Sequence, residues 1–177
     1  MKPVEPGLVK LFVGVLFSDE HLLERALEML FEKYGDIDFV SDSFPFDNTG
    51  YYEPEMGSPI YRKFVSFERL VHPKEMARIK IETNEIEDLL AVKHNRKVNL
   101  DPGIMDYDKV VLASAKYNGQ KIYLDRGIWA DLTFHFEKNR FDPYPWSFPD
   151  FKKGLYNDVF LKIRQKFKEQ RRISDVL

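Results

Sequence analysis

The stretch that decides the fold is Leu8–Phe17, with the sequence LVKLFVGVLF. It is almost continuously apolar, and only Lys10 and Gly14 interrupt it. Strands that are buried on both faces of a sheet have this pattern. The stretch is also far shorter than the ~20 apolar residues that a membrane-spanning helix needs. The sequence therefore predicts a central strand of a sheet over residues 8–17.

A helix is expected directly after this strand. Ser18 has the side chain of an N-cap, two acidic residues follow it, and Gly35 has the character of a C-terminal stop. The spacing predicts a helix over residues 19–34. Its apolar residues recur at helical spacing and are Leu22, Leu23, Ala26, Leu27, Leu30 and Phe31.

The next 65 or so residues repeat the strand and helix signals. Strands are expected over residues 37–43 and 60–70, and a helix from His72-Pro73 to near Val92. A short strand over 96–100 should then stop at the Asp101-Pro-Gly turn. This strand-helix-strand-strand-helix-strand order is that of a ferredoxin-like split βαβ unit.

A group of short strands is expected next. Residues 110–117 and 121–124 flank Asn118-Gly119, which is a strong hairpin signal, and residues 128–136 alternate between apolar and polar. We interpret this part as a three-stranded meander. A helix over 108–116 is the alternative, because Asp106 could cap it.

The chain is expected to end in an irregular segment and a helix. Residues 141–150 are rich in proline and aromatic residues, and should lie across a surface. The final helix should begin near Asp150. Its apolar residues lie four apart and are Leu155, Val159, Ile163 and Phe167.

Composition places these elements in one domain. The 177 residues are 44% hydrophobic and 32% charged, which is typical of a globular chain, and the net charge is −2. We predict a single α+β domain over 1–177, with a mixed or antiparallel sheet and helices mainly on one face. The N-terminus does not resemble a signal peptide, so we expect a soluble cytoplasmic protein. The absence of Cys and the scarcity of Gln favour a thermophilic source.

The best candidate for a functional site is the segment FPFDNTGYYEPEMG at residues 44–57. It has neither helical nor strand periodicity, and long loops in compact domains are usually functional or disordered. Its four aromatic residues argue against disorder. We expect a cleft where this segment meets the turn at residues 99–103.

Acidic residues of these two segments could do chemistry. In an extended segment Glu53 and Glu55 would point to the same side, and with Asp101 they could bind a divalent cation or move protons. Asp47 and Asn99 could complete such a site. The alternative is that these side chains serve turns and ion pairs.

Other polar and aromatic residues could bind a ligand. Strand interiors seldom carry many cations unless these face a cleft or pair with acids, so an anionic substrate or ion pairs with glutamates are the two alternatives. The residues in question are Lys63, Lys80, Asn84, Arg69 and Lys116. The aromatic residues that could stack on a ring, or only pack, are Tyr51, Tyr52 and Trp129.

Several strings resemble those of the prokaryotic domain-of-unknown-function family 4416, over almost the whole chain. The most specific are YYEPEMG at 51–57 and NLDPG at 99–103, and the others are KLFVG at 10–14, FERL at 67–70, TNE at 83–85, IYL at 122–124 and PWSFPD at 145–150. The resemblance implies no activity, although members have been loosely labelled GTP-binding proteins. The chain contains no G-x-x-x-x-G-K-[ST] phosphate loop, so the residues do not support GTP as the ligand.

Taken together, these features predict a domain that binds a small anionic or nucleotide-like ligand. The sequence does not decide whether it also turns that ligand over, nor which cofactor it uses; a divalent metal is one option. The first alternative is a protein-interaction module or homodimer that uses the aromatic residues of 44–57 and 141–149. The second is nucleic-acid binding through the basic face of the last helix, which is less expected because charge runs usually only solvate a face.

Overall fold

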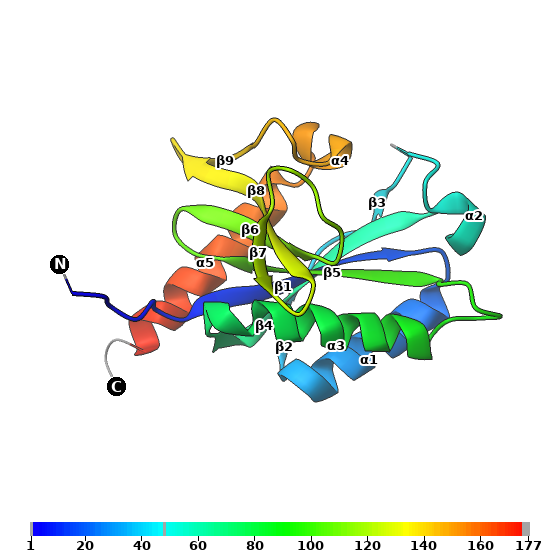
Figure 1. Cartoon of the computed structure of the whole chain (residues 1–177), viewed down its shortest axis with the longest axis horizontal. Helices are drawn as coiled ribbons and strands as arrows, with labels where there is room; N and C mark the ends of the chain where they lie inside the picture. Colours follow the sequence, from blue (N-terminus) through cyan, green and yellow to red (C-terminus); the bar gives the residue numbers. More distant parts are fainter. Residues whose placement is uncertain (1, 48, 175–177) are drawn as a thin grey trace.

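The computed structural model describes residues 2–47 and 49–174, which form one antiparallel sheet with helices on both of its faces (Figure 1). The strands are β1 (Val9–Phe17), β2 (Ile37–Val40), β3 (Phe44–Pro45), β4 (Tyr61–Val71), β5 (Val98–Met105), β6 (Lys109–Ser114), β7 (Ile122–Asp125), β8 (Ile128–Glu137) and β9 (Arg140–Pro143). The helices are α1 (Glu20–Tyr34), α2 (Glu53–Met56), η1 (Pro73–Glu75), α3 (Met76–Leu89), α4 (Pro149–Lys152) and α5 (Asn157–Ser174).

β1 is the central strand that its sequence predicts. All nine of its residues are buried, and it pairs with β4 on one side and β5 on the other. The sheet order begins β2-β4-β1-β5, so β4 lies between β1 and β2, and β1 lies between β4 and β5. This is the arrangement of two interleaved βαβ units, as the ferredoxin-like order predicts.

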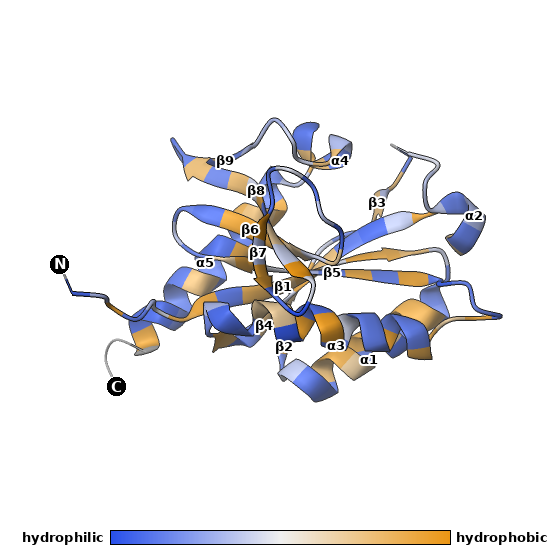
Figure 2. Ribbon diagram, viewed as in Figure 1, coloured by the Kyte–Doolittle hydropathy of each residue, from blue (hydrophilic) through white to orange (hydrophobic). Residues whose placement is uncertain are grey.

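Helices cover both faces of the sheet, so the expectation that they lie mainly on one face is wrong. Alternate residues of β1, such as Val13 and Val15, pack with α1 and α3. Phe12 faces the opposite side, where it packs with Phe151 of α4 and Phe160 of α5. Figure 2 shows the result: β1 is mostly hydrophobic, whereas the helices carry both colours. No helix in the described part of the chain is long and apolar enough to cross a membrane.

The first two predicted helices begin and end close to the expected residues, whereas the last, α5, begins at Asn157 and not near Asp150, which lies in the short helix α4. Asp19 rather than Ser18 is the N-cap of α1, because its carboxylate accepts a hydrogen bond from the Leu22 amide. Gly35 ends that helix with a φ of 89°, a conformation that favours glycine. A capping box at His72 precedes α3, which ends at Leu89, three residues before the expected end.

The strands after β5 are present, but their order is not that of a meander. β8 lies between β6 and β7, so Asn118-Gly119 joins strands that are not neighbours. Neither residue has the positive φ that a two-residue hairpin turn requires, whereas Arg126 and Gly127 have φ values of 52° and 80° and close the β7–β8 hairpin. The helical alternative for residues 108–116 is wrong, because this segment forms β6.

β5 runs through the Asp101-Pro-Gly turn that was expected to stop it. β6 pairs only with Gly103–Met105, so residues 98–102 have a strand partner on the β1 side alone. Proline is tolerated where one edge of a strand is free, because it has no amide hydrogen to contribute there. The outer edge of β5 is therefore open to side chains from elsewhere in the chain.

Residues 44–47 and 49–57 have a small core of their own. Phe46 and Met56 are buried and pack with Leu16 of β1. The Met56 carbonyl accepts hydrogen bonds from Ser18 Oγ at 2.5 Å and from Lys97 Nζ at 3.0 Å. These contacts hold the segment beside the first residues of β5.

A buried polar network attaches α5 to the sheet. Lys10 of β1 is fully buried and donates to the Asp38 carboxylate, to the Phe67 carbonyl at 2.6 Å and to Gln170 of α5 at 2.8 Å. Ser66 Oγ and Gln170 Nε2 also donate hydrogen bonds to the Asp38 carboxylate, each at 2.6 Å. Burial lowers the pKa of Lys10, and its contacts with Asp38 oppose this shift. The network explains why a lysine interrupts the central strand.

We predict that Gly103→Ala destabilises the protein by about 1–3 kcal/mol, as overpacking of a core does. An added Cβ at Gly103 would lie 2.4 Å from Phe12 Cζ and 2.8 Å from the Val111 carbonyl oxygen. Gly119→Ala is the control, because its Cβ would meet nothing within 4 Å. Urea unfolding measures both, and equal stability of the two variants would contradict this packing.

Candidate functional site

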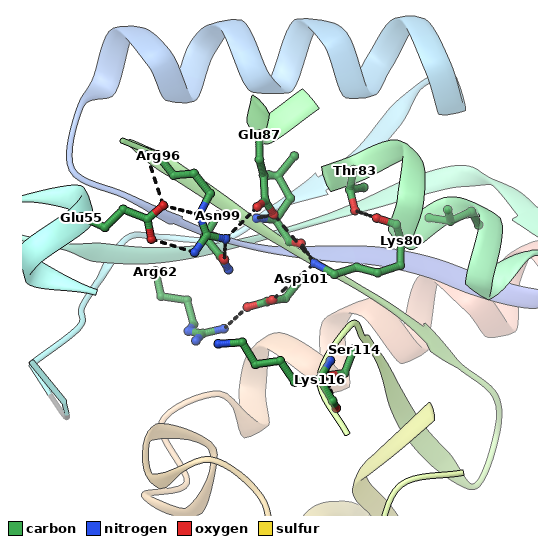
Figure 3. A network of polar contacts seen from close by, with 12 residues as sticks. Glu55, Arg62, Lys80, Thr83, Glu87, Arg96, Asn99, Asp101, Ser114 and Lys116 are labelled. Carbon is green, nitrogen blue, oxygen red and sulfur yellow. Dashed lines mark hydrogen bonds and ion pairs between the residues drawn. The ribbon is translucent and has the colours of Figure 1, made fainter. Parts of the chain in front are cut away.

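The candidate site is built around Arg62, which crosses over the central strand. Arg62 and Asn99 flank Leu16 on one face of the sheet, and Asp101 pairs with Gly14, two residues along β1. Arg62 Nη1 lies 3.8 Å from Asp101 Oδ2 (Figure 3). An added Cβ at Gly14 would lie 3.3 Å from Arg62 Nη1, so a larger residue there would crowd the guanidinium. Glycine at this position therefore gives Arg62 room to reach Asp101.

Arg62 is enclosed on its other side by aromatic and acidic residues. Only 3% of the residue is exposed, and its Nε lies 2.9 Å from Asp150 Oδ2. Asp150 is itself buried and accepts a hydrogen bond from Tyr156 at 3.0 Å. The guanidinium lies over the Phe46 and Phe151 rings, 5.1 and 5.2 Å from their centres. The buried charge is thus paired and held in one position.

Two buried nitrogen groups at this site lack hydrogen-bond acceptors. The first is Arg62 Nε, which lies 2.9 Å from Asp150 Oδ2 as an ion pair without hydrogen-bond geometry. Asn99 is 4% exposed, and its Oδ1 accepts from Arg96 Nη1 at 2.9 Å. That bond fixes the amide orientation, and Asn99 Nδ2 has no partner among the described residues. Buried donors without acceptors are rare in proteins and call for an explanation.

Side chains of α3 close the open edge of β5 at Leu100. Lys80 Nζ donates to the Leu100 carbonyl at 2.7 Å, and the Leu100 amide donates to Glu87 Oε1 at 2.6 Å. Lys80 Nζ also lies 4.0 Å from Asp101 Oδ1. Burial raises the pKa of Glu87, and the nearby Lys80 charge opposes this shift. Asn84 lies on the same stripe of α3, between Lys80 and Glu87.

Arg96 connects α2 to this edge. It makes a two-pronged ion pair with Glu55, through Nε at 2.7 Å and Nη2 at 2.8 Å, and donates to Glu87 Oε2 at 2.9 Å. The hydrogen bond from Arg96 lowers the pKa of Glu55. No pattern in the sequence points to Arg96, because it lies just before β5 and its partners Glu55 and Glu87 are distant in the chain.

Lys116 joins the segment 44–57 to the other end of the site. Its Nζ hydrogen-bonds to the Tyr51 hydroxyl at 2.5 Å and lies 4.4 Å from the centre of that ring. This hydrogen bond lowers the pKa of Tyr51. Tyr52 is half-buried, and burial together with the negative charge of Asp101 raises its pKa. The segment 44–57 and the residues 99–101 therefore meet, as the sequence predicts.

The loop that presents Lys116 is held by a second buried ion pair. Lys121 Nζ donates to Ser114 Oγ at 2.8 Å and to the Lys116 carbonyl at 3.2 Å, and lies 3.4 Å from Asp131 Oδ2. The Lys116 amide donates to Ser114 Oγ at 3.2 Å. Burial raises the pKa of Asp131. These contacts with Lys121 and Ser114 therefore hold the backbone of Lys116 in place.

The expected geometry of Glu53 and Glu55 is wrong. They lie in the helical turn α2, so they do not point to one side as an extended segment would make them. Glu55 binds Arg96, and the exposed Glu53 carboxylate makes no ion pair with a described residue. Asp47 lies 3.9 Å from Lys153 at the surface. Within residues 2–47 and 49–174, no three Asp, Glu or His side chains lie together as a metal site requires.

Three other candidate residues are not part of this site. Lys63 pairs with Val15 in register and so faces α1 and α3, on the opposite side of the sheet from Arg62. Arg69 lies near the far end of β4 and lines a surface hollow of about 520 Å³. Trp129 packs against Tyr117 and Tyr123, with ring centres 5.0 and 5.1 Å apart.

Two surface hollows among the described residues do not coincide with the expected cleft, although Phe44, the first residue of the 44–57 segment, lines one of them. The first is lined by residues 32–36, 68 and 69. The second, of about 330 Å³, lies between residues 39–44 and the start of α5. Neither is lined by residues 45–57 or 99–103.

The fold and site together define a class: an α+β domain with a ferredoxin-like core, an antiparallel extension and a polar cluster at the free edge of β5. The sequence profile of the family described as Domain of unknown function (DUF4416) matches residues 7–167, and the chain belongs to this family. No curated protein matches the chain, and neither does any solved structure.

We predict that the Glu55–Arg96 pair stabilises the protein at neutral pH and not in acid. The pKa of Glu55 is lowered in the folded state, so the unfolded chain takes up this proton first as the pH falls. The difference in melting temperature between wild type and Glu55→Gln should therefore shrink from about pH 7 to about pH 3. Glu53→Gln is the control and should follow the wild type at both values, and a Glu55→Gln difference that is constant with pH would contradict the prediction.

Proposed function

We propose that the chain binds a small anionic ligand at the Arg62 site. The observation that carries this proposal is the buried Asn99 Nδ2, which has no acceptor among the described residues, on the same face of the sheet as Arg62, whose Nη1 lies 3.8 Å from Asp101 Oδ2 and so beyond hydrogen-bond distance. A buried donor without an acceptor costs about 1–3 kcal/mol, and more when it is charged. An anion with several acceptor oxygens would remove that cost, and a guanidinium suits phosphate and carboxylate groups in particular.

Lys116 is the cation of the site that is available to an anion. Glu55 and Glu87 are bound by Arg96, Glu87 also pairs with Lys80 at 3.7 Å, and Arg62 pairs with Asp150 and Asp101. The four cations and four carboxylates of the site therefore balance, but Lys116 makes no ion pair with a described carboxylate, and its Nζ hydrogen-bonds only to the Tyr51 hydroxyl. A cation placed in this way attracts anions.

Three of the strings that resemble those of the family lie near Arg62. Residues 51–57 contribute Tyr52, residues 99–103 contribute Asn99 and Asp101, and residues 145–150 contribute Asp150. These strings are far apart in the sequence, and the ion pairs of Arg62 join the last two of them. Nucleotide-like ligands belong among those tested, because they carry the phosphate groups that a guanidinium suits.

A homodimer is the second candidate function, and one observation favours it. The edge strand β7 pairs only with β8, and Ile122, Tyr123 and Leu124 on it are exposed. Exposed apolar edge strands pair readily with another strand. Light scattering should then show a dimer for the wild type and a monomer for Tyr123→Lys, and a monomeric wild type would remove this candidate.

We predict that a phosphate-bearing ligand raises the melting temperature. At 100 times its dissociation constant it should add about 2.7 kcal/mol, or roughly 5–11 °C for a domain of this size. Inorganic phosphate, sulfate, sugar phosphates and nucleoside monophosphates form the panel. If no ligand of this panel raises the melting temperature, in mild denaturant as well as in buffer, the proposal is contradicted.

Two variants test whether the ligand binds at this site. Asn99→Asp keeps the size of the side chain but replaces the free donor by an acceptor, and should weaken binding about 10- to 100-fold by calorimetry. Lys116→Gln should weaken it less, because this cation is exposed. Lys63→Gln, on the opposite face, is the matched control. Arg62 itself is unsuitable, since its removal would leave Asp150 buried and unpaired at a cost of about 3–5 kcal/mol.

A further inference from the structure

We propose that the ligand of this site carries a hydroxyl group close to its anionic group, as a polyol phosphate or sugar phosphate does, and that Asp101 accepts the hydrogen bond of that hydroxyl. The inference rests on the proposed function and names the class of ligand. It is drawn from the free acceptors of Asp101, which are separate from the free donors of Arg62 and Asn99.

The Asp101 carboxylate has unused acceptor capacity. It is 23% exposed and makes no hydrogen bond with a described residue. Its nearest cations are Arg62 Nη1 at 3.8 Å and Lys80 Nζ at 4.0 Å, which are ion-pair distances and too long for hydrogen bonds. An ionised carboxylate is acceptor-only, so a ligand group that fills this position must be a donor.

A simple anion would satisfy only the donors of the site and would leave Asp101 without a hydrogen-bond partner. Asp101 lies beside the donors that would bind the anion, and its negative charge would repel any anion there. A ligand that presents acceptors to Arg62 and Asn99, and a hydroxyl to Asp101, turns this repulsion into a hydrogen bond. Charge-assisted hydrogen bonds of this kind are shorter and stronger than neutral ones.

The backbone places the two functions side by side. Asn99 and Asp101 are two residues apart on β5 and point to the same face, which separates them by about 6–7 Å along the strand. Arg62 Nη1 reaches Asp101 from the side of Asn99 (Figure 3). A small ligand can therefore contact both with groups that are a few bonds apart.

Tyr52 adds a donor to the same place. Its ring is half-buried beside Phe46, with ring centres 5.9 Å apart, and its hydroxyl makes no hydrogen bond with a described residue. Burial and the negative charge of Asp101 both raise the pKa of Tyr52. The phenol stays protonated at neutral pH and can donate to a ligand oxygen.

The test compares two probes that differ only in hydroxyl groups. Glycerol 3-phosphate and propyl phosphate have the same anionic group on a three-carbon chain. By calorimetry the wild type should bind glycerol 3-phosphate about 10- to 100-fold more tightly, as expected for a hydrogen bond to a charged group. Ribose 5-phosphate is a second hydroxylated probe.

Asp101→Ala should reverse part of this preference. It should weaken glycerol 3-phosphate binding and should strengthen propyl phosphate binding, because the repelling charge is gone. A merely structural role for Asp101 would weaken both probes alike, and that result would overturn the inference. Asp101→Asn, which keeps the size of the side chain, guards against loss of folding and should also narrow the difference between the probes.

The outcomes separate this inference from the proposed function. If the wild type binds both probes equally, the role of Asp101 is wrong and the anion site stands. If it binds neither these probes nor any member of the anion panel, both proposals fall. If glycerol 3-phosphate alone binds and Asp101→Ala loses it, both are supported.

Discussion

The site depends on one constraint: a guanidinium must cross the central strand of the sheet. Arg62 starts on β4, passes over Gly14 and joins Asp150 on one side to Asp101 on the other. The charge is nearly buried, so it is stable only because acids and aromatic rings surround it. The positions of α4 and of Phe46 are tied to this crossing, because each supplies part of that surrounding.

The free edge of β5 is the second determinant. Residues 98–102 lack a strand partner on the side away from β1, and α3 supplies Lys80 and Glu87 to the backbone of Leu100 in its place. Side chains can approach such an edge from several elements, whereas a paired strand would exclude them. The extension by β6 begins only at Gly103, which leaves the edge available to Arg96 and Lys116 from either end.

Local patterns in the sequence predicted β1, α1, α3 and the ferredoxin-like order, because burial and capping depend on neighbours along the chain. The meeting of residues 44–57 with 99–101 was also predicted. The patterns did not identify Arg62 as a site residue. The one indication of its burial is that it lies two residues before Phe64, and therefore on the same face of a buried strand. The prediction for Glu53 and Glu55 was wrong because they lie in a helical turn and not in an extended segment. The hairpin predicted at Asn118-Gly119 is absent because neither residue has a positive φ. Side-chain pairing across strands cannot be deduced from periodicity alone.

A crystal structure of the protein grown with tungstate, a heavy analogue of phosphate, tests the central claim most directly. The account predicts anomalous density for tungsten within hydrogen-bond reach of Arg62 Nη1 and Asn99 Nδ2, with the guanidinium still paired to Asp150. Tungstate bound only at surface lysines, or Arg62 with all its nitrogens bonded to protein groups, would contradict it.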